Sequence, residues 1–381
     1  MPQMCITLIV ATLALLCAFS THGQPCNAPR VVDIYNGGTN ALEIQIRGDV
    51  GFVTLARGLS IIDVSDPSNI AEIGIFHTTS ELRDSFVEGN HAYLAAMHDG
   101  LLVIDISDLS NPVLVGSIQT VGVAMGVEVT HGDAFVTSIT NSTRSRPGGF
   151  EVYDVSIPEN PTFTSRIEEV GHLIDLQIVQ SIALLAAGSE GVVAVDISNP
   201  AQLSVVGQVG QGESVIGVLY EDGVIYASNS VGGVLFISAS DFASMSVFAH
   251  NDTSDQAWAC SRLGNLLYVA DDEGGVLVWD VSDFGNIQEV ANVEHVHRSR
   301  AVDILATEQG FYVAQQSSNL RLYRLGSCQP DVNCDGFLTP TDFTAWINAF
   351  NNNLPECDQN IDESCTPTDF TAWIANFNAG C

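Results

Sequence analysis

The chain has 381 residues and carries 45 acidic against 12 basic side chains, a net charge of −33. Every basic residue is an arginine, which excludes mechanisms that depend on a lysine, such as a P-loop phosphate site or a Schiff base. The charge also excludes nucleic acid as a partner, because neutralising phosphates requires a basic face. A hydrophobic content of 46% with 15% charged residues indicates a folded, globular chain.

The first predicted element is an apolar run over residues 6–19. It is too short to span a bilayer comfortably, and small polar residues follow it up to Gly23. This arrangement is typical of a secretory signal that is cleaved near Gly23. We therefore expect residues 1–23 to be a signal peptide, the mature chain to have no transmembrane segment, and the protein to be secreted or displayed on the cell surface.

The middle of the chain repeats a phrase of the form apolar-apolar-Asp-apolar-Ser about every 42 residues. Five copies keep the Asp, and two degenerate copies replace it with Phe236 and Arg324. The five are Asp63, Asp105, Asp154, Asp196 and Asp280. Because this Asp recurs where a strand meets a turn, we interpret it as a cap for backbone amides rather than as a catalytic group.

Each repeat contains four short β-like runs separated by Gly, Asn, Asp or Pro, which is typical of one propeller blade. Seven copies predict a mainly β protein with a seven-bladed β-propeller over residues 24–327. The last copy lacks its fourth strand, and residues 27–34 match the fourth strand at 111–118. We expect this N-terminal strand to close the last blade. A bond between Cys26 and Cys328 would lock the closure and contribute about 4–5 kcal/mol in the chain-entropy model.

The repeated VIDIS-like phrases resemble those of LVIVD-repeat propellers, which occur in exported bacterial proteins, over about residues 27–325. The resemblance implies the propeller fold. It implies little about activity, because propellers host ligand binding and many chemistries alike.

One position in each repeat falls on the predicted innermost strand, and it is acidic in four of the seven copies. These residues are Glu43, Asp84, Asp175 and Asp303. Innermost strands line the axis of a propeller, so the carboxylates are expected to lie at the channel. Two interpretations stay open: the carboxylates converge on a cation, or they face a wet channel and cap neighbouring backbone amides.

Residues 331–350 and 358–377 repeat each other, and each begins with a loop of the form Asp-x-Asn-x-Asp that has Asp at its twelfth position. Oxygen ligands at positions 1, 3, 5, 7, 9 and 12 suit Ca²⁺. The first loop would use Asp331, Asn333, Asp335, Phe337, Thr339 and Asp342. The second would use Asp358, Asn360, Asp362, Ser364, Thr366 and Asp369. The second of the two ions is expected to bind more weakly, because Glu363 replaces the turn glycine.

A helix is predicted after each loop, with a threonine cap and a proline in its first turn. Apolar side chains then recur at helical spacing and predict one buried face per helix. They are Phe343, Trp346, Ile347 and Phe350, and then Phe370, Trp373, Ile374 and Phe377. Residues 328–381 are therefore expected to form a small α-helical domain that ions and disulfides stabilise.

This tail resembles dockerin domains, in particular a cysteine-containing variant that ends in Ala-Gly-Cys. The resemblance implies calcium-dependent binding to a cohesin-like or cell-surface protein. The family's partner-contact positions fall on Pro340 and Thr341 and on Pro367 and Thr368, where proline departs from the usual Ser or Thr. The alternative interpretation is a calcium-stabilised minidomain without a partner.

Cysteines cluster in the tail, which indicates disulfides formed in an oxidising compartment. The candidates are Cys26, Cys328, Cys334, Cys357, Cys365 and Cys381. The dockerin pattern implies Cys328–Cys381 with Cys357–Cys365, which competes with the Cys26–Cys328 bond. Cys260 stands alone in a predicted buried strand and is expected to be free.

The sequence contains no nucleophile elbow, metal-binding histidine pair or phosphate loop. It therefore favours a non-catalytic binding or scaffold protein over an enzyme. In this interpretation the propeller face binds an unknown ligand and the tail attaches the protein to a cell-surface or extracellular assembly. The alternative is a propeller hydrolase or lyase that acts on extracellular polysaccharide and is docked through the same tail.

Overall fold

The computed structural model describes residues 29–35, 37, 40–67, 69–140, 148–168, 170–293, 299–316, 319–325, 340–352 and 366–379. The chain divides into two compact units, one formed by Val31–Arg324 and one that contains the C-terminal helices. No helix in the described ranges is long and apolar enough to cross a membrane.

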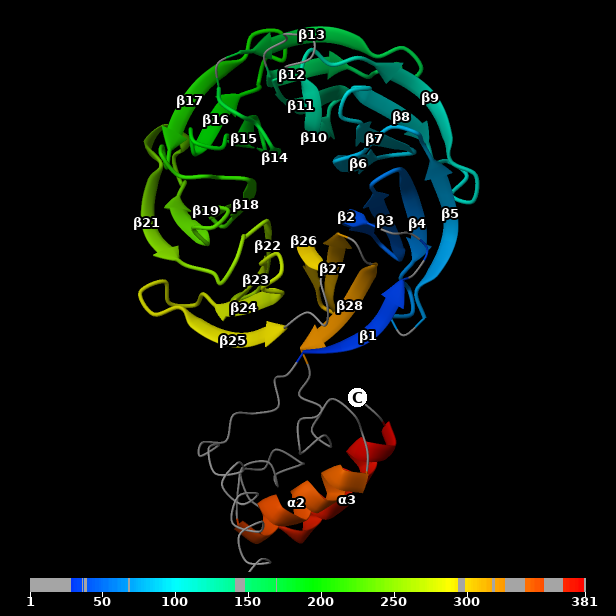
Figure 1. Ribbon diagram of the computed structural model, residues 1–381, viewed down its shortest axis with the longest axis vertical. Helices are drawn as coiled ribbons and strands as arrows, with labels where there is room; N and C mark the ends of the chain where they lie inside the picture. Colours follow the sequence, from blue (N-terminus) through cyan, green and yellow to red (C-terminus); the bar gives the residue numbers. More distant parts are fainter. Residues whose placement is uncertain are drawn as a thin grey trace, which may run out of the picture. The chain divides into compact units, whose positions relative to one another are not determined.

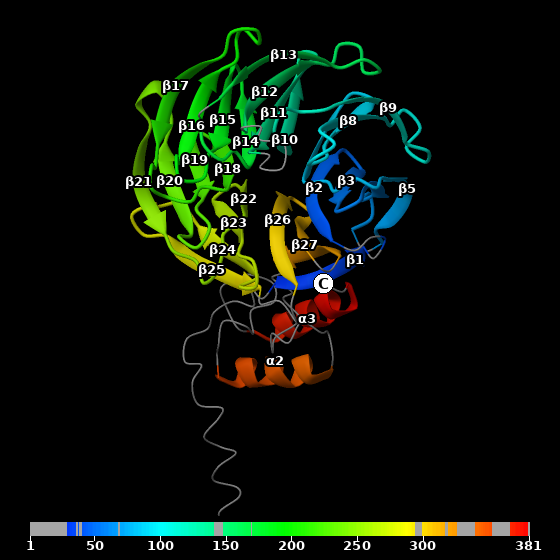
Figure 2. The same cartoon turned by 45° about the horizontal axis from the view of Figure 1, so that its top comes forward.

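The larger unit is a ring of seven four-stranded antiparallel sheets around a central axis (Figures 1 and 2). The innermost strands are β2 (Ala41–Arg47), β6 (Asp84–Glu88), β10 (Val123–Thr130), β14 (Asp175–Val179), β18 (Gly217–Glu221), β22 (Ala259–Leu263) and β26 (Arg300–Thr307). The second strands are β3 (Val50–Leu55), β7 (His91–Ala95), β11 (Asp133–Ile139), β15 (Ile182–Ala186), β19 (Val224–Ser228), β23 (Leu266–Ala270) and β27 (Gly310–Gln316).

The third strands are β4 (Gly58–Asp63), β8 (Leu101–Asp105), β12 (Gly149–Asp154), β16 (Val192–Asp196), β20 (Val234–Ser238), β24 (Val276–Asp280) and β28 (Leu320–Leu325). The outermost strands are β1 (Pro29–Tyr35), β5 (Ala71–His77), β9 (Val113–Ile118), β13 (Thr162–Ile167), β17 (Ser204–Val209), β21 (Ser246–Asn251) and β25 (Gln288–Val293). A short 3₁₀ helix, η1 (Phe242–Ser244), precedes β21.

The ring closes as the repeat arithmetic predicts. The last sheet has the order β1-β28-β27-β26, so the N-terminal strand supplies the fourth strand of the seventh blade. Joining the two ends of the chain in one sheet removes the exposed edge that an incomplete blade would present.

The hydrophobic core lies between neighbouring blades. One cluster joins Phe135 and Phe150 of the third blade to Leu185 and Val193 of the fourth. Second and third strands are therefore covered on both faces, and this explains why they are continuous apolar runs rather than alternating ones. Six of the second strands carry an aromatic residue at the same place, and the fourth blade carries Leu184 there. All seven side chains are buried, as in Tyr226, which is 1% exposed.

The repeated Asp of the sequence phrase caps the turn after the five third strands that carry it, as predicted. The Oδ1 atom of each Asp accepts a hydrogen bond from the amide two residues later. The distances are 2.9 Å for Asp63, 2.8 Å for Asp105, 2.9 Å for Asp154, 2.8 Å for Asp196 and 2.8 Å for Asp280. Hydrogen bonds to the following serine lower the pKa of all five carboxyl groups.

The C-terminal helices are α2 (Pro340–Asn352) and α3 (Pro367–Ala379), and each begins at the predicted proline. Their aromatic side chains pack together, with ring centroids 5.2 Å apart for Phe343 and Trp373 and 5.4 Å apart for Trp346 and Phe370. The predicted apolar faces are wrong at Ile347 of α2 and at Phe370 and Ile374 of α3, which are 39%, 38% and 40% exposed.

On α2 the buried side runs through Asp342, Trp346 and Ala349. This direction turns Ile347 toward solvent.

Candidate functional site

The four predicted axial acids occupy one level of the propeller channel. Glu43, Asp84, Asp175 and Asp303 pair with Thr54, Ala95, Ala186 and Ala314, which hold the same place on the second strand of their blades. All four side chains line an open cavity of about 180 Å³. The remaining blades carry Gly126, Gly217 and Ala259 at this level, so the polar lining is unequal around the ring.

Each axial carboxylate holds the next blade in place. The Ile44 amide donates to Asp303 over 2.9 Å, the Ser85 amide to Glu43 over 2.8 Å, and the Val127 amide to Asp84 over 2.7 Å. The Val218 amide donates to Asp175 over 2.9 Å. In each bond the acid and the amide belong to the innermost strands of successive blades, so the carboxylates have a structural role as amide acceptors.

The sequence prediction did not include a fifth acid, Glu128. This residue lies on β10, two residues after Gly126, which holds the repeat position of the third blade. Its Oε2 accepts the Ile178 amide over 2.6 Å and so continues the blade-to-blade pattern where Gly126 has no side chain. Successive residues of a strand alternate between its faces, so position i+2 points the same way as position i. That alternation is the signal that would have found Glu128, and also Gln45, which accepts the Val87 amide over 2.9 Å.

Burial in the channel changes the protonation of these acids. It raises the pKa of Asp84 and Asp175 to about 7, of Asp303 to about 6 and of Glu128 to about 8. It also raises the pKa of Glu43 well above its ordinary value, with the neighbouring charge of Asp84 and a hydrogen bond between the two carboxyl groups adding to the effect. Near neutral pH the channel is therefore only partly ionised.

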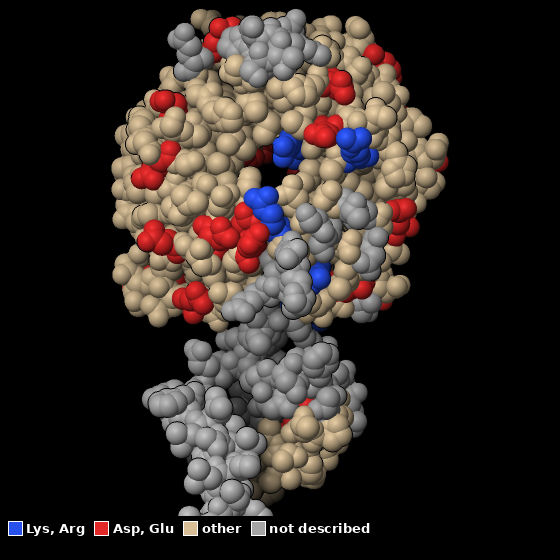
Figure 3. All heavy atoms as spheres, viewed as in Figure 1, with Lys and Arg blue, Asp and Glu red and all other residues tan. Residues whose placement is uncertain are grey.

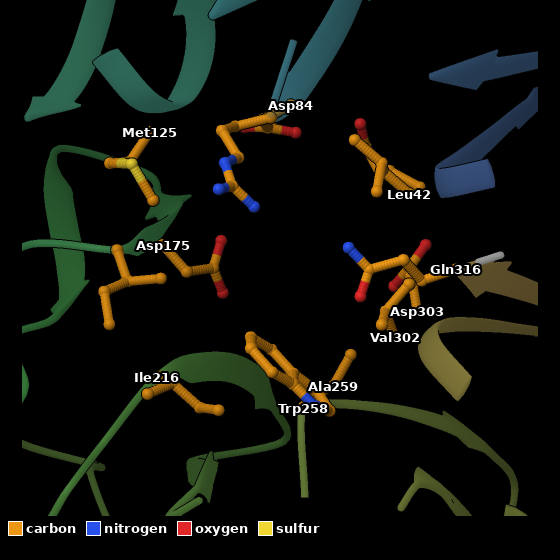
Figure 4. A pocket seen from close by; sticks show the side chains of 13 residues that line it. Leu42, Asp84, Met125, Asp175, Ile216, Trp258, Ala259, Val302, Asp303 and Gln316 are labelled. Carbon is orange, nitrogen blue, oxygen red and sulfur yellow. The ribbon is translucent and has the colours of Figure 1, made fainter. Parts of the chain in front are cut away.

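The residues just before the axial level form a collar at the mouth of the cavity. Most of this collar is apolar, and Arg83 is its charged member. The collar consists of Leu42, Arg83, Met125, Ile174, Ile216, Trp258 and Val302. Figure 3 shows the opening at the centre of the propeller face, with basic side chains at its edge. Figure 4 shows the Asp175 and Asp303 side chains among the labelled residues around this opening.

Trp258 is held in place by a polar network at the rim. Its indole nitrogen donates to Asp272 over 3.3 Å, and the Arg300 guanidinium lies 5.6 Å from the ring centre. Arg300 pairs with Asp272 through two nitrogens and donates to Gln316 over 3.0 Å. These contacts fix the aromatic wall of the cavity, because cation–π and bidentate contacts both restrict rotation.

No group of three His, Cys, Asp or Glu side chains is arranged to hold a metal ion within the described ranges. The axial cation site stays a prediction, and the observed amide contacts favour the capping interpretation. Cys260, on β22, carries a free thiol as expected, and burial raises its pKa to about 12.

In the tail, the two residues at loop position twelve are both fully buried: Asp342 and Asp369 are each 0% exposed. Asp369 accepts hydrogen bonds from the Thr366 amide over 2.7 Å and from its hydroxyl over 3.1 Å, which caps the start of α3. The predicted partner-contact residues are exposed in the first turns of the two helices. They are Pro340, Thr341, Pro367 and Thr368.

Several predictions of the sequence lie outside the described residues. They are the signal segment 1–23, the loop ligands Asp331, Asn333, Asp335, Phe337, Thr339, Asp358, Asn360, Asp362 and Ser364, and the cysteines Cys26, Cys328, Cys334, Cys357, Cys365 and Cys381.

Comparisons with known proteins agree with this architecture. The LVIVD repeat model matches residues 38–78, 83–120, 178–210 and 256–295. No curated protein matches the chain. The crystal structure of the computationally designed Ika8 protein is similar with a TM-score of 0.57 and 10% identity, over 78% of this chain and 100% of that one.

The crystal structure of Chaetomium thermophilum Raptor is similar with a TM-score of 0.62 and 12% identity, over 77% of this chain and 29% of that one. At such low identity these structures are evidence for the fold alone. The chain carries LVIVD repeats and folds as a seven-bladed β-propeller.

Proposed function

We propose that the chain is an exported, non-catalytic binding or scaffold protein. Its propeller provides the interaction surface, and its C-terminal domain is a dockerin-like module that attaches the protein to a cell-surface or extracellular assembly through calcium. The observation that carries the non-catalytic part is the use of every axial carboxylate as an acceptor for an amide of the next blade.

The alternative function, a hydrolase acting on polysaccharide, is the weaker candidate because the axial carboxylates are engaged with backbone amides. Glycoside hydrolysis requires one carboxyl group to deliver a proton and a second to attack or to activate water. Asp84 and Asp175 are instead engaged with backbone amides of neighbouring strands. Carboxylates that position the scaffold in this way are better suited to shaping a binding surface than to changing roles during a reaction.

Two buried acids in equivalent places support calcium binding by the tail. A carboxylate without solvent needs compensating charge or hydrogen bonds, and Asp342 and Asp369 are each fully buried at the start of a helix. Each would supply the twelfth-position oxygen ligand of its loop, after the predicted ligands at positions 1, 3, 5, 7 and 9. Bound calcium would place a positive charge beside these carboxylates and would hold each loop against its helix.

The exposed first turns of α2 and α3 support a docking role. Pro340 with Thr341, and Pro367 with Thr368, present the same pair of side chains twice on one small domain. We propose that these turns contact a cohesin-like or cell-surface protein, and that disulfides among the tail cysteines stabilise the domain after export.

Calcium titration of the full-length protein by calorimetry tests this function. We expect two binding events, of which Asp342→Asn removes one and Asp369→Asn the other. Asp63→Asn is the matched control, because it makes the same chemical change at an exposed turn of the propeller and should leave both events intact. A featureless titration of the folded wild-type protein would refute the calcium role.

Attachment is tested next by capture on immobilised full-length protein from a surface extract of the native cells. A partner should be retained in calcium, released by EGTA and lost with the Asp342→Asn/Asp369→Asn double variant. Release of sugars from extracellular polysaccharides by the purified protein would overturn the non-catalytic assignment.

A further inference from the structure

The channel mouth has two layers of opposite character. The outer layer is the collar, in which Leu42, Met125, Ile174, Ile216 and Val302 present apolar side chains around a solvent-open cavity of about 180 Å³. The inner layer presents the carboxyl groups of the axial acids. The amide contacts between blades explain the acids, but they do not explain an apolar ring at an opening to water, where polar side chains are the norm.

This layering suits a ligand with a charged end and an apolar stem. Long amphipathic side chains bury their methylene groups against apolar surface and place the charged head in polar surroundings. At this mouth the collar would cover the stem, and the head would reach the level of Asp175 and Asp303. When they are ionised, these carboxylates accept hydrogen bonds and carry negative charge, so they favour a head that donates hydrogen bonds and carries positive charge.

We propose that the channel mouth binds a primary ammonium group carried on an unbranched apolar stem, either a free alkylamine or the side chain of a lysine in a partner protein. The inference rests on the proposed binding function of the propeller face and names the chemistry that this face recognises. The chain itself contains no lysine, so no such group on its own side chains competes for the mouth. The net charge of −33 attracts cations to the protein as a whole.

Arg83 is the one cationic side chain in the collar, and it makes the proposal sharper. The positive charge of Arg83 repels an incoming ammonium group. Without the axial carboxylates, this charge would make the mouth favour an anion. Removing the Arg83 charge should therefore tighten ammonium binding, whereas it would weaken the binding of an anion.

Ammonium binding should also depend on proton release. The charged groups that face the channel are Glu43 on β2, Arg83 just before β6, Asp84 on β6, Glu128 on β10, Asp175 on β14 and Asp303 on β26, and the ion pair of Arg300 with Asp272 lies at the rim. The pKa of Glu43 is raised, and the pKa values of the other four acids lie between about 6 and about 8, so these four lose most of their protons as the pH rises from about 5 to about 9. The affinity for an ammonium group should rise over the same interval.

The test measures binding to the calcium-loaded full-length protein by calorimetry at pH 8 and low salt. The probes are n-pentylammonium for a free amine and N-acetyl-lysine-N-methylamide for a protein side chain, with n-pentanol and pentanoate as neutral and anionic analogues. We expect n-pentylammonium to bind at least about tenfold more tightly than n-pentanol, because hydrogen bonds to a charged group are stronger than neutral ones. Preference for the lysine amide over n-pentylammonium would identify a partner protein as the source, and the reverse a free amine.

Three variants complete the test. Asp175→Asn and Asp303→Asn keep an oxygen for the amide of the next blade and should each weaken n-pentylammonium binding about tenfold. Arg83→Gln should tighten it about twofold. Asp196→Asn, the same change at an exposed turn of the fourth blade, should have no effect.

Equal binding of n-pentylammonium and n-pentanol, or tighter binding of pentanoate, would overturn the proposal. So would unchanged n-pentylammonium binding in both Asp→Asn variants, each of which still unfolds in a cooperative transition. The calcium titration of the tail is independent of these outcomes. If the protein binds calcium but no ammonium probe, only the ammonium inference is refuted. If it binds the ammonium probe but no calcium, only the calcium-dependent attachment is refuted.

Discussion

Replacing Asp303 with asparagine should change how the stability of the propeller depends on pH. Asp303 accepts the Ile44 amide and so joins the innermost strand of the seventh blade to that of the first. Asparagine keeps one oxygen for this bond and removes the ionisable group. The substitution therefore separates the charge of the side chain from its role as an acceptor.

The sign of the effect follows from the pKa of Asp303, which burial raises from 3.8 to about 6. The folded state binds the proton more tightly than the unfolded state. The stability contributed by this group is thus fully present below about pH 4 and is lost as the pH rises through about 6. One pKa unit corresponds to about 1.4 kcal/mol, so the full difference is about 3 kcal/mol. Water in the open channel screens the charge and reduces the expected value to about 2 kcal/mol.

Urea unfolding at pH 4 and pH 8 measures this quantity. The free energy of unfolding of Asp303→Asn, relative to the wild type, should become more favourable by about 2 kcal/mol between the two pH values. Asp196→Asn is the control, because the pKa of Asp196 is lowered rather than raised and its carboxylate is already ionised above pH 4. The stability of this variant relative to the wild type should therefore not become more favourable between the two pH values. A relative stability of Asp303→Asn that is the same at both pH values would show that Asp303 does not titrate in the channel.

Three further predictions concern the buried groups of both units. Replacing Glu151 with leucine should lower the free energy of unfolding by about 3–5 kcal/mol, because Glu151 is 0% exposed and accepts hydrogen bonds from the Val121 and Gly122 amides and the Ser138 hydroxyl. Glu151→Gln should lower it less in the same urea titration. The Cys260 thiol, with its pKa near 12, should resist iodoacetamide at pH 8 in the native protein and react once urea unfolds it, and rapid native labelling would contradict its burial. Trp346→Ala should lower the helical circular dichroism of the tail, because the Trp346 ring packs on Phe350 and Phe370; an unchanged helical signal would contradict this packing.

Much of the candidate site could be predicted from the repeat. The repeat position on the innermost strand, nine residues before the aromatic residue of the second strand or Leu184 in the fourth blade, correctly placed the four axial acids at one level. They are Glu43, Asp84, Asp175 and Asp303, and the count works because all blades share the same register between first and second strands. Glu128 escaped this count, because the repeat position of its blade holds Gly126 and the carboxylate comes from the next residue on the same face. The collar escaped it as well. Its members each precede an axial position by one residue, but they differ in side chain from blade to blade, and they become one surface only when the ring closes.

The sequence by itself determined the number of blades, the strand that closes the ring and the role of the repeated Asp. Each of these follows from local chemistry: a strand-length apolar run, a turn residue, and a carboxylate two residues from the amide that it caps. Only the tertiary structure decided the role of the axial acids. The Ile44 amide and the Asp303 carboxylate are 259 residues apart in the chain, and no local pattern distinguishes an acid that waits for a cation from one that accepts an amide of the neighbouring blade. Burial in the shared channel, which also raises the pKa of these acids, is a property of the assembled ring.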